Sequence, residues 1–244
     1  MLKHTYALVL LLFVSHHYNH IYDMVYRDKR DWSPGKVSSV DISLVHYPKG
    51  LWLKSQIGIR MRLAASEIGS NFDFTKIEAQ SRLNILPSKK TFIKLRLLGG
   101  MISGTPSLQD RFYLFGGMEL EGILSPLADG KGTFSPQDHL QVSGGGGMRG
   151  YYGQHLAGKV IAALNMDAKV PYFPLELFFD TGNIWDDYVK VHVGKLRHDA
   201  GVSIDLGVIA FHFPLWVSEP SKGEKNFKFR WVVSVSSPTL TIGI

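Results

Sequence analysis

Apolar and polar residues alternate along most of this sequence, and that period of two restricts the fold more than any other feature. From Leu51 to Leu63 the odd positions are mostly aliphatic, whereas the even positions are mostly polar and include Arg60 and Arg62. Successive side chains of a β-strand point to opposite faces of its sheet, so each such segment predicts a strand with one apolar and one polar face. Helical periodicity is weak throughout the chain.

The same alternation recurs in about nine or ten segments when the N-terminal run is counted. The others cover residues 37–47, 51–64, 72–84, 90–102, 156–170, 174–185, 198–206, 207–217 and 226–237. Their length of about 9 to 13 residues matches strands that cross a bilayer at a tilt, and it exceeds the usual length in soluble sheets. We therefore expect an all-β fold, an antiparallel transmembrane β-barrel whose mid-strand charges face a wet lumen.

The composition excludes several other classes of protein. The 244 residues carry a formal net charge of +6 and no cysteine, which leaves no disulfide framework, thiolate zinc site or cysteine nucleophile. No stretch approaches the roughly 20 apolar residues that a spanning helix needs. The basic residues are spread along the chain without the clustered patch of a nucleic-acid site, so we expect no nucleic-acid partner.

The N-terminal residues 1–22 allow two interpretations. The apolar run over residues 6–14 resembles the core of a signal peptide, but it equally fits a first strand. We assign residues 23–244 to one outer-membrane β-barrel domain. We expect no metal site at the histidines that follow the run, because no acidic partner stands beside them; they are His16, His17 and His20.

The region from residue 104 to residue 155 breaks the alternation and is too long for a plain connector. It contains Phe115-Gly116-Gly117 and, further on, Arg149-Gly150-Tyr151. Directly before the second motif stands a run of four glycines, Gly144, Gly145, Gly146 and Gly147. Their spacing fits neither the Walker pattern nor the dinucleotide fingerprint, so we expect no bound nucleotide and no cofactor.

These residues resemble the C-terminal portion of the barrel of the BamA-type outer-membrane assembly factors, the bacterial surface antigen superfamily. That family has a phenylalanine–glycine–glycine element, then an Arg-Gly-Tyr or Arg-Gly-Phe motif in a long loop that folds back into the barrel. An acidic residue follows on the next strand, shortly before a proline, and a phenylalanine–acid–glycine motif lies on the strand after it. The matching positions are Phe115-Gly116-Gly117, Arg149-Gly150-Tyr151, Asp167 before Pro171, and Phe178-Phe179-Asp180-Thr181-Gly182. Asp167 stands where the family more often has Glu. The resemblance covers residues from about 112 onward by motif, and the earlier strands only by pattern.

The alternation places Asp167 and Asp180 on the polar face, where an arginine brought in by the loop can reach both. The planar fork of donors on a guanidinium suits two carboxylates. We therefore predict a structural latch rather than a catalytic site, and the alternative is that these are separate solvated charges in the lumen. The residues of the latch motif are Arg149, Gly150, Tyr151, Asp167, Asp180 and Gly182.

The resemblance implies a non-enzymatic protein of the outer membrane of a Gram-negative-type envelope, surrounded by lipid and acting without a cofactor. Its implied function is the insertion of outer-membrane proteins or the translocation of polypeptides. The implied partners are unfolded outer-membrane or secreted polypeptides and a fused or neighbouring periplasmic domain. Two alternatives stay open: a barrel that anchors a fused or partner metallopeptidase or patatin-like lipase, and a soluble β-sandwich binding protein. Relatives have more strands, so the chain is either part of a larger barrel or a reduced barrel.

Overall fold

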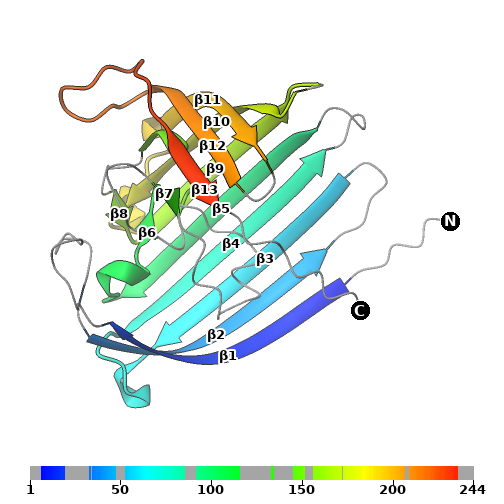
Figure 1. Ribbon diagram of the computed structural model, residues 1–244. Helices are drawn as coiled ribbons and strands as arrows, with labels where there is room; N and C mark the ends of the chain where they lie inside the picture. Colours follow the sequence, from blue (N-terminus) through cyan, green and yellow to red (C-terminus); the bar gives the residue numbers. More distant parts are fainter. Residues whose placement is uncertain are drawn as a thin grey trace.

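A large antiparallel sheet dominates the computed structural model of this chain. The structure describes residues 7–19, 33, 35–47, 53–85, 92–115, 133–134, 145–151, 156–171, 173–206 and 209–235. The sheet has 11 strands in the order β1-β2-β3-β4-β5-β9-β10-β11-β12-β13-β7. The long strands lie side by side in chain order, so the sheet is built from successive hairpins (Figure 1).

The long strands follow closely the segments that the alternation predicts. They are β1 (Ala7–Asn19), β2 (Gly35–Tyr47), β3 (Leu53–Ala64), β4 (Phe74–Ile85), β5 (Ile93–Gly104), β9 (Val160–Lys169), β10 (Leu175–Trp185), β11 (Arg197–Asp205) and β12 (Ile209–Val217). The sheet also contains the four-residue strand β13 (Val232–Val235). The short elements are β6 (Phe112–Tyr113), β7 (Thr133–Phe134), β8 (Ala157–Gly158), and the 3-10 turns η2 (Ser66–Ile68), η3 (Leu108–Asp110), η4 (Arg149–Tyr151), η5 (Tyr188–Lys190) and η6 (Val193–Lys195). Within the described residues, no helix has the length and apolar character needed to cross a membrane.

The polarity of the two faces of the sheet is the reverse of that in a soluble protein, because the polar face is buried and the apolar face is exposed. One face carries buried polar side chains, such as Asp41 (3% exposed), Glu78 (4%) and Asp180 (0%). The opposite face carries exposed aliphatic side chains, such as Ile59 and Leu97, both 48% exposed. A polar interior with an apolar exterior is the arrangement of a transmembrane β-barrel, and it confirms the fold class that the alternation predicts.

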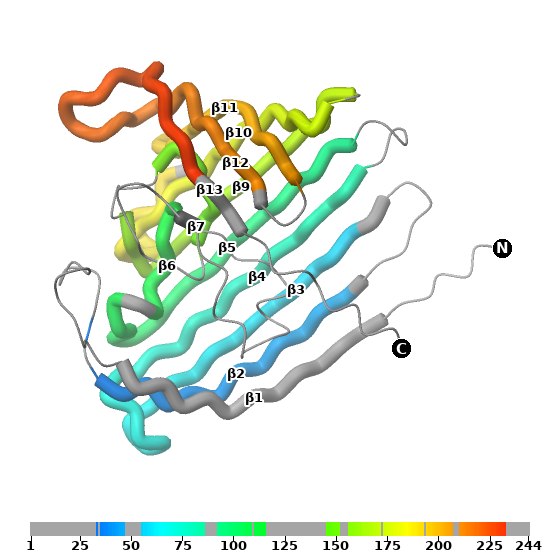
Figure 2. The backbone as a smooth tube through the Cα atoms, in the orientation of Figure 1, coloured from blue at the N-terminus to red at the C-terminus, as the bar shows by residue number. Residues whose placement is uncertain are grey.

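The sheet curls, but it is not closed within the described residues. There, β1 pairs only with β2, and the far edge is the short β7 from the long loop, which pairs with Val233 and Ser234 of β13. Figure 2 traces the neighbouring strands β2, β3, β4 and β5 in chain order across the sheet. The only other described sheet is the pair β6–β8, so the described strands do not form the two large packed sheets of a β-sandwich.

The last segment departs from the expected strand over residues 226–237. Within the described part of that segment, Val232–Val235 forms β13, and Phe227 pairs with Trp216 of β12 only as an isolated bridge. Residues 236–237 lie outside the described residues. The guanidinium of Arg230 donates to Glu224 and to the backbone carbonyls of Lys225 and Lys228, so it binds the chain between the bridge and the turn before it. The alternation still persists, since Phe229 is 69% exposed and Arg230 only 4%.

Candidate functional site

The long loop between β5 and β9 folds back onto the polar face of the sheet. Its two ends pair as β6 and β8, and the Leu114 N–H donates to the Leu156 carbonyl (3.0 Å). The returning chain adds a bond from the Gly146 N–H to the Tyr113 carbonyl (2.7 Å). Apolar side chains bury this contact, namely Leu114, Met148, Tyr151 and Val217. The described parts of the loop therefore form a folded insert against the sheet.

The glycine run lets the backbone pass close to the wall of the sheet. Gly147 has φ +72°, and a Cβ built there would lie 2.4 Å from Nη1 of Arg96. Arg96 in turn donates to the Gly145 carbonyl (3.0 Å), so a strand side chain holds the backbone of the loop directly. Three of the predicted loop glycines lie outside the described residues, namely Gly116, Gly117 and Gly144.

Arg149 lies in η4 and reaches carboxylates on two neighbouring strands. Its Nη1 donates to Asp167 Oδ1 of β9 (2.6 Å). Its Nε and Nη2 donate to the two oxygens of Asp180 on β10 (2.8 Å and 2.7 Å), and its backbone N–H also donates to Asp180 (3.2 Å). The guanidinium lies over the ring of Phe178, 3.8 Å from the ring centre. The structure thus brings together the three charged residues that the sequence singled out.

The electrostatics of this contact favour a permanently charged arginine. Burial alone would lower the pKa of Arg149, but the carboxylates of Asp180 and Asp167 outweigh burial, and the pKa lies above its ordinary value. The side chain of Arg149 is 13% exposed and that of Asp180 is 0% exposed, so water screens the pair only weakly. Breaking such a pair leaves a buried charge without a partner and costs about 3–5 kcal/mol. Among the described residues, no cluster of histidine and acidic side chains is placed to hold a metal ion.

Two glycines of the motif allow close approaches. A Cβ at Gly150 would lie 2.5 Å from Cγ1 of Val217 and 2.6 Å from Cβ of Asp199, so the turn can rest on β11 and β12 only without a side chain there. A Cβ at Gly182 would lie 2.6 Å from the Ala162 carbonyl oxygen on the neighbouring strand. Both positions need a glycine because of what lies beside them.

Tyr151 fastens the other side of the turn. Its hydroxyl donates to the His198 carbonyl (3.1 Å) and lies 3.0 Å from the hydroxyl of Ser218. The ring is fully buried, and burial raises the pKa of the Tyr151 hydroxyl above its ordinary value. Arg149 and Tyr151 therefore bind different strands from the same turn.

A second ionic cluster, which the sequence did not reveal, holds the start of the loop. Asp110 of η3 pairs with Arg62 on β3 (3.1 Å), and its backbone carbonyl accepts from Nζ of Lys76 on β4 (3.0 Å). Arg62 also binds Asp41 on β2 (2.9 Å), and Lys76 lies over the ring of Phe112 (4.4 Å). The alternation puts Arg62 and Lys76 on the polar face, but no motif marks Asp110 as their partner.

Asp199 is a further residue that the sequence reasoning did not single out. It lies directly opposite Asp180 in the pairing of β10 with β11, and it is 0% exposed. The alternation along β11 places Asp199 on the same polar face as Ser203 and Asp205. That alternation could have identified Asp199 as an inward-facing carboxyl.

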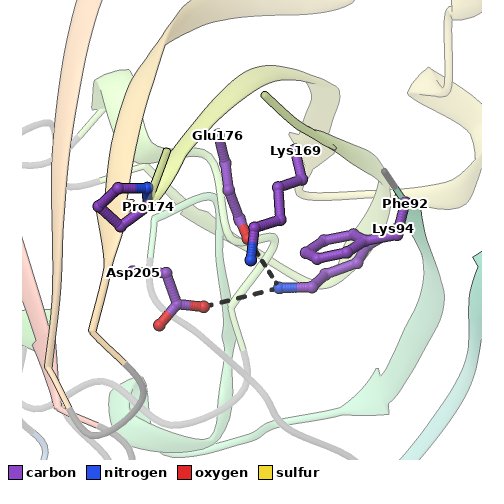
Figure 3. A pocket seen from close by; sticks show the side chains of 6 residues that line it. All are labelled: Phe92, Lys94, Lys169, Pro174, Glu176 and Asp205. Carbon is purple, nitrogen blue, oxygen red and sulfur yellow. Dashed lines mark hydrogen bonds and ion pairs between the residues drawn. The ribbon is translucent and has the colours of Figure 1, made fainter. Parts of the chain in front are cut away.

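A small pocket lies on the polar face beside the turn between β9 and β10. It has a volume of about 350 Å³, and its lining residues are Phe92, Lys94, Lys169, Pro174, Glu176 and Asp205 (Figure 3). The ammonium of Lys94 lies between Glu176 (3.2 Å) and Asp205 (3.6 Å). The ammonium groups of Lys94 and Lys169 lie 4.7 Å and 5.3 Å from the Phe92 ring centre. This part of the wall therefore offers charges of both signs beside an aromatic ring.

Comparisons with known proteins show a likeness of fold and no likeness of sequence. No family model matches the chain, and no curated protein sequence matches it. Solved structures do match, and 19 of their chains share this fold. One is CdiB from Escherichia coli, with a TM-score of 0.58 and 15% sequence identity over 94% of this chain. The match covers 42% of the CdiB chain, so this chain spans less than half the length of that protein.

Proposed function

We propose that this chain forms part of an Omp85-type barrel of the outer membrane, which passes polypeptides across or into that membrane. The observation that carries the proposal is the combination of an inverted sheet with a folded loop held on its polar face by Arg149. The likeness of fold to CdiB supports an Omp85-type barrel and polypeptide translocation. The Arg-Gly-Tyr motif and its carboxylates support the same assignment through their resemblance to the surface antigen family.

The exposed apolar face supports a location in the membrane. Its aliphatic side chains need a hydrocarbon environment, and they include Ile42, Leu44, Ile57, Ile59, Ile77, Leu97, Met101, Met166 and Leu177, each at least 37% exposed. We propose that outer-membrane lipid covers this face in a Gram-negative-type envelope, and that a fused or neighbouring periplasmic domain recruits the substrate. A surface of this kind left in water would promote association between chains.

The charged inner wall supports an extended polypeptide as the substrate. Lys94, Lys169 and Asp205 present both signs of charge next to Phe92, so the wall can meet the mixed side chains of an unfolded segment. BamA-type insertion of outer-membrane proteins is the finer form of this proposal, and export of a secreted polypeptide is the other form.

Site-specific photocrosslinking tests the proposed function. A photoreactive amino acid replaces Lys94 on the inner wall and, as the matched control, Leu97 on the outer face of the same strand β5. In cells pulse-labelled for newly made envelope proteins, the expected result is polypeptide adducts at position 94 and lipid adducts at position 97. Adducts to precursors of outer-membrane proteins would favour insertion, and adducts to a secreted polypeptide would favour export. Equal adducts at both positions, or none at position 94 during active export, would contradict the proposal.

A further inference from the structure

Three carboxyl groups meet one guanidinium beneath the Arg-Gly-Tyr turn. Asp167 and Asp180 both bind Arg149, whose Nε, Nη1 and Nη2 are all engaged by these two residues. Asp199 is the third carboxyl, and it lies opposite Asp180 on the next strand. Directly opposed residues of an antiparallel pair have Cβ atoms about 4.5–5.5 Å apart, so the Asp180 and Asp199 carboxyls are close neighbours.

Burial and the neighbouring Asp180 both disfavour a negative charge on Asp199, and the charge of Arg149 and the backbone N–H of Gly150 offset them only in part. Both carboxyl oxygens of Asp199 are buried, and no side chain among the described residues donates a hydrogen bond to them. Its partner across β12 is Val217, and the Cα of Gly150 faces its Cβ from the turn. An ionised carboxylate buried without a donor is strongly disfavoured, and a like charge beside it makes the ionised form less favourable still.

The other charged and titratable groups around the turn are already engaged elsewhere. Arg197, on the same strand as Asp199, binds Glu219 (3.0 Å) and the side chain of Asn183. Three other groups remain. The Tyr151 hydroxyl donates to the His198 carbonyl, and the ring of His198 stacks on Phe179. The ring of His212 binds the hydroxyl of Ser203. None of these contacts supplies a proton or a positive charge to the oxygens of Asp199.

We propose that Asp199 is protonated and donates its O–H to Asp180, and that loss of this proton releases the Arg-Gly-Tyr turn. A protonated carboxyl has an O–H that donates to Asp180, which satisfies one oxygen of Asp199 and removes the repulsion between the two groups. On release, the O–H bond breaks and the proton passes to water in the lumen, while the electron pair stays on the carboxylate. The charged Asp199 then lies beside Asp180, with only the backbone N–H of Gly150 and the already paired guanidinium of Arg149 to offset its charge.

The direction of the pH dependence follows from the proton count. A carboxyl in the unfolded or released chain is ionised above its ordinary pKa of about 3.9, so the seated state binds one proton more than the released state. The seated state therefore loses stability as the pH rises. Release becomes up to about tenfold more favourable per pH unit until Asp199 also ionises in the seated state.

The test uses the full chain reconstituted in vesicles, with Asp199→Asn as the informative variant. An asparagine amide donates to Asp180 as the O–H does, but it cannot ionise. The matched control is Asp205→Asn, on the same strand and 36% exposed at its side chain. Infrared spectra report protonated carboxyls, and hydrogen exchange at the amides of Gly146 and Met148 reports how often the turn opens. Exchange is compared with that of β9 amides at each pH, which removes the intrinsic pH dependence.

The expected result is a protonated-carboxyl band at neutral pH in the wild type and in Asp205→Asn, but not in Asp199→Asn. Protection of the turn should fall as the pH rises in the wild type and stay flat in Asp199→Asn. The absence of the band from the wild type would overturn the proposal, even if the variant failed to assemble. Protection that is independent of pH, or that disappears when divalent cations are removed, would also overturn it, because a bound cation would then balance the two charges.

Discussion

Replacing Arg149 by alanine removes the side-chain contacts of residue 149 with β9 and β10. Three charge-assisted hydrogen bonds are lost, at 2.6, 2.7 and 2.8 Å, and the 0% exposed carboxylate of Asp180 loses its positive partner while it keeps the backbone N–H of residue 149. Removing one partner of a buried pair costs about 3–5 kcal/mol. The middle of that range, about 4 kcal/mol, corresponds to a roughly thousandfold more favourable opening of the turn.

Hydrogen exchange measures that opening directly. The amides of Gly146 and Met148 donate to carbonyls at the other end of the loop, so they become exposed only when the turn detaches. We expect their exchange to accelerate by about two to three orders of magnitude in Arg149→Ala, while the amides of β9 keep their protection. Lys190→Ala removes an exposed charge from η5 and serves as the control, with no expected change. Exchange within threefold of the wild type in Arg149→Ala would refute the latch.

Three other substitutions test separate parts of the structure. Gly150→Ala should detach the turn, because the Cβ of the new alanine would lie 2.6 Å from the Cβ of Asp199. Overpacking of this kind costs about 1–3 kcal/mol, and the same hydrogen-exchange experiment would show it as faster exchange. Asp110→Asn should raise exchange at the amides of residues 110 and 111, because it weakens the pair with Arg62 and the bond from Ser107. The amides of Gly146 and Met148 should stay protected, because they donate to the carbonyls of Tyr113 and Leu114. Ile59→Arg should destabilise the protein folded in vesicles by about 2–4 kcal/mol, because this 48% exposed side chain faces lipid near the middle of its strand. Urea titration measures the change, and an unchanged midpoint would contradict a lipid-facing position.

The strands could be predicted from the sequence because each carries its own signal. The alternation around Arg60 and Arg62 fixes both the strand and the face to which each side chain points, without knowledge of the rest of the fold. The residues of the latch could be predicted for a related reason. The alternation places Asp167 and Asp180 on the polar face of their strands, and Arg149 stands in a short motif that resembles a family pattern.

The remaining contacts depend on how distant segments meet, which no local pattern encodes. Asp110 binds Arg62, 48 positions earlier in the chain, through a 3-10 turn that has no motif of its own. Asp199 becomes notable only once the register places it opposite Asp180. The regular alternation over residues 226–237 predicts one strand, but within the described residues it is divided into a bridge at Phe227 and the strand Val232–Val235. Between them Arg230 binds Glu224, a contact that the alternation does not encode.

A membrane barrel requires that one face of the sheet lies in lipid and the other in a wet lumen. Because the chain has no cysteine, single cysteines can be introduced along β5 and treated with a water-soluble maleimide in reconstituted vesicles. Cysteines at Lys94 and Arg96 should react, whereas cysteines at Leu95 and Leu97 should react only with a lipid-soluble reagent. Equal reaction of all four positions with the water-soluble reagent, or a chain that stays soluble and monomeric without detergent, would contradict the membrane barrel.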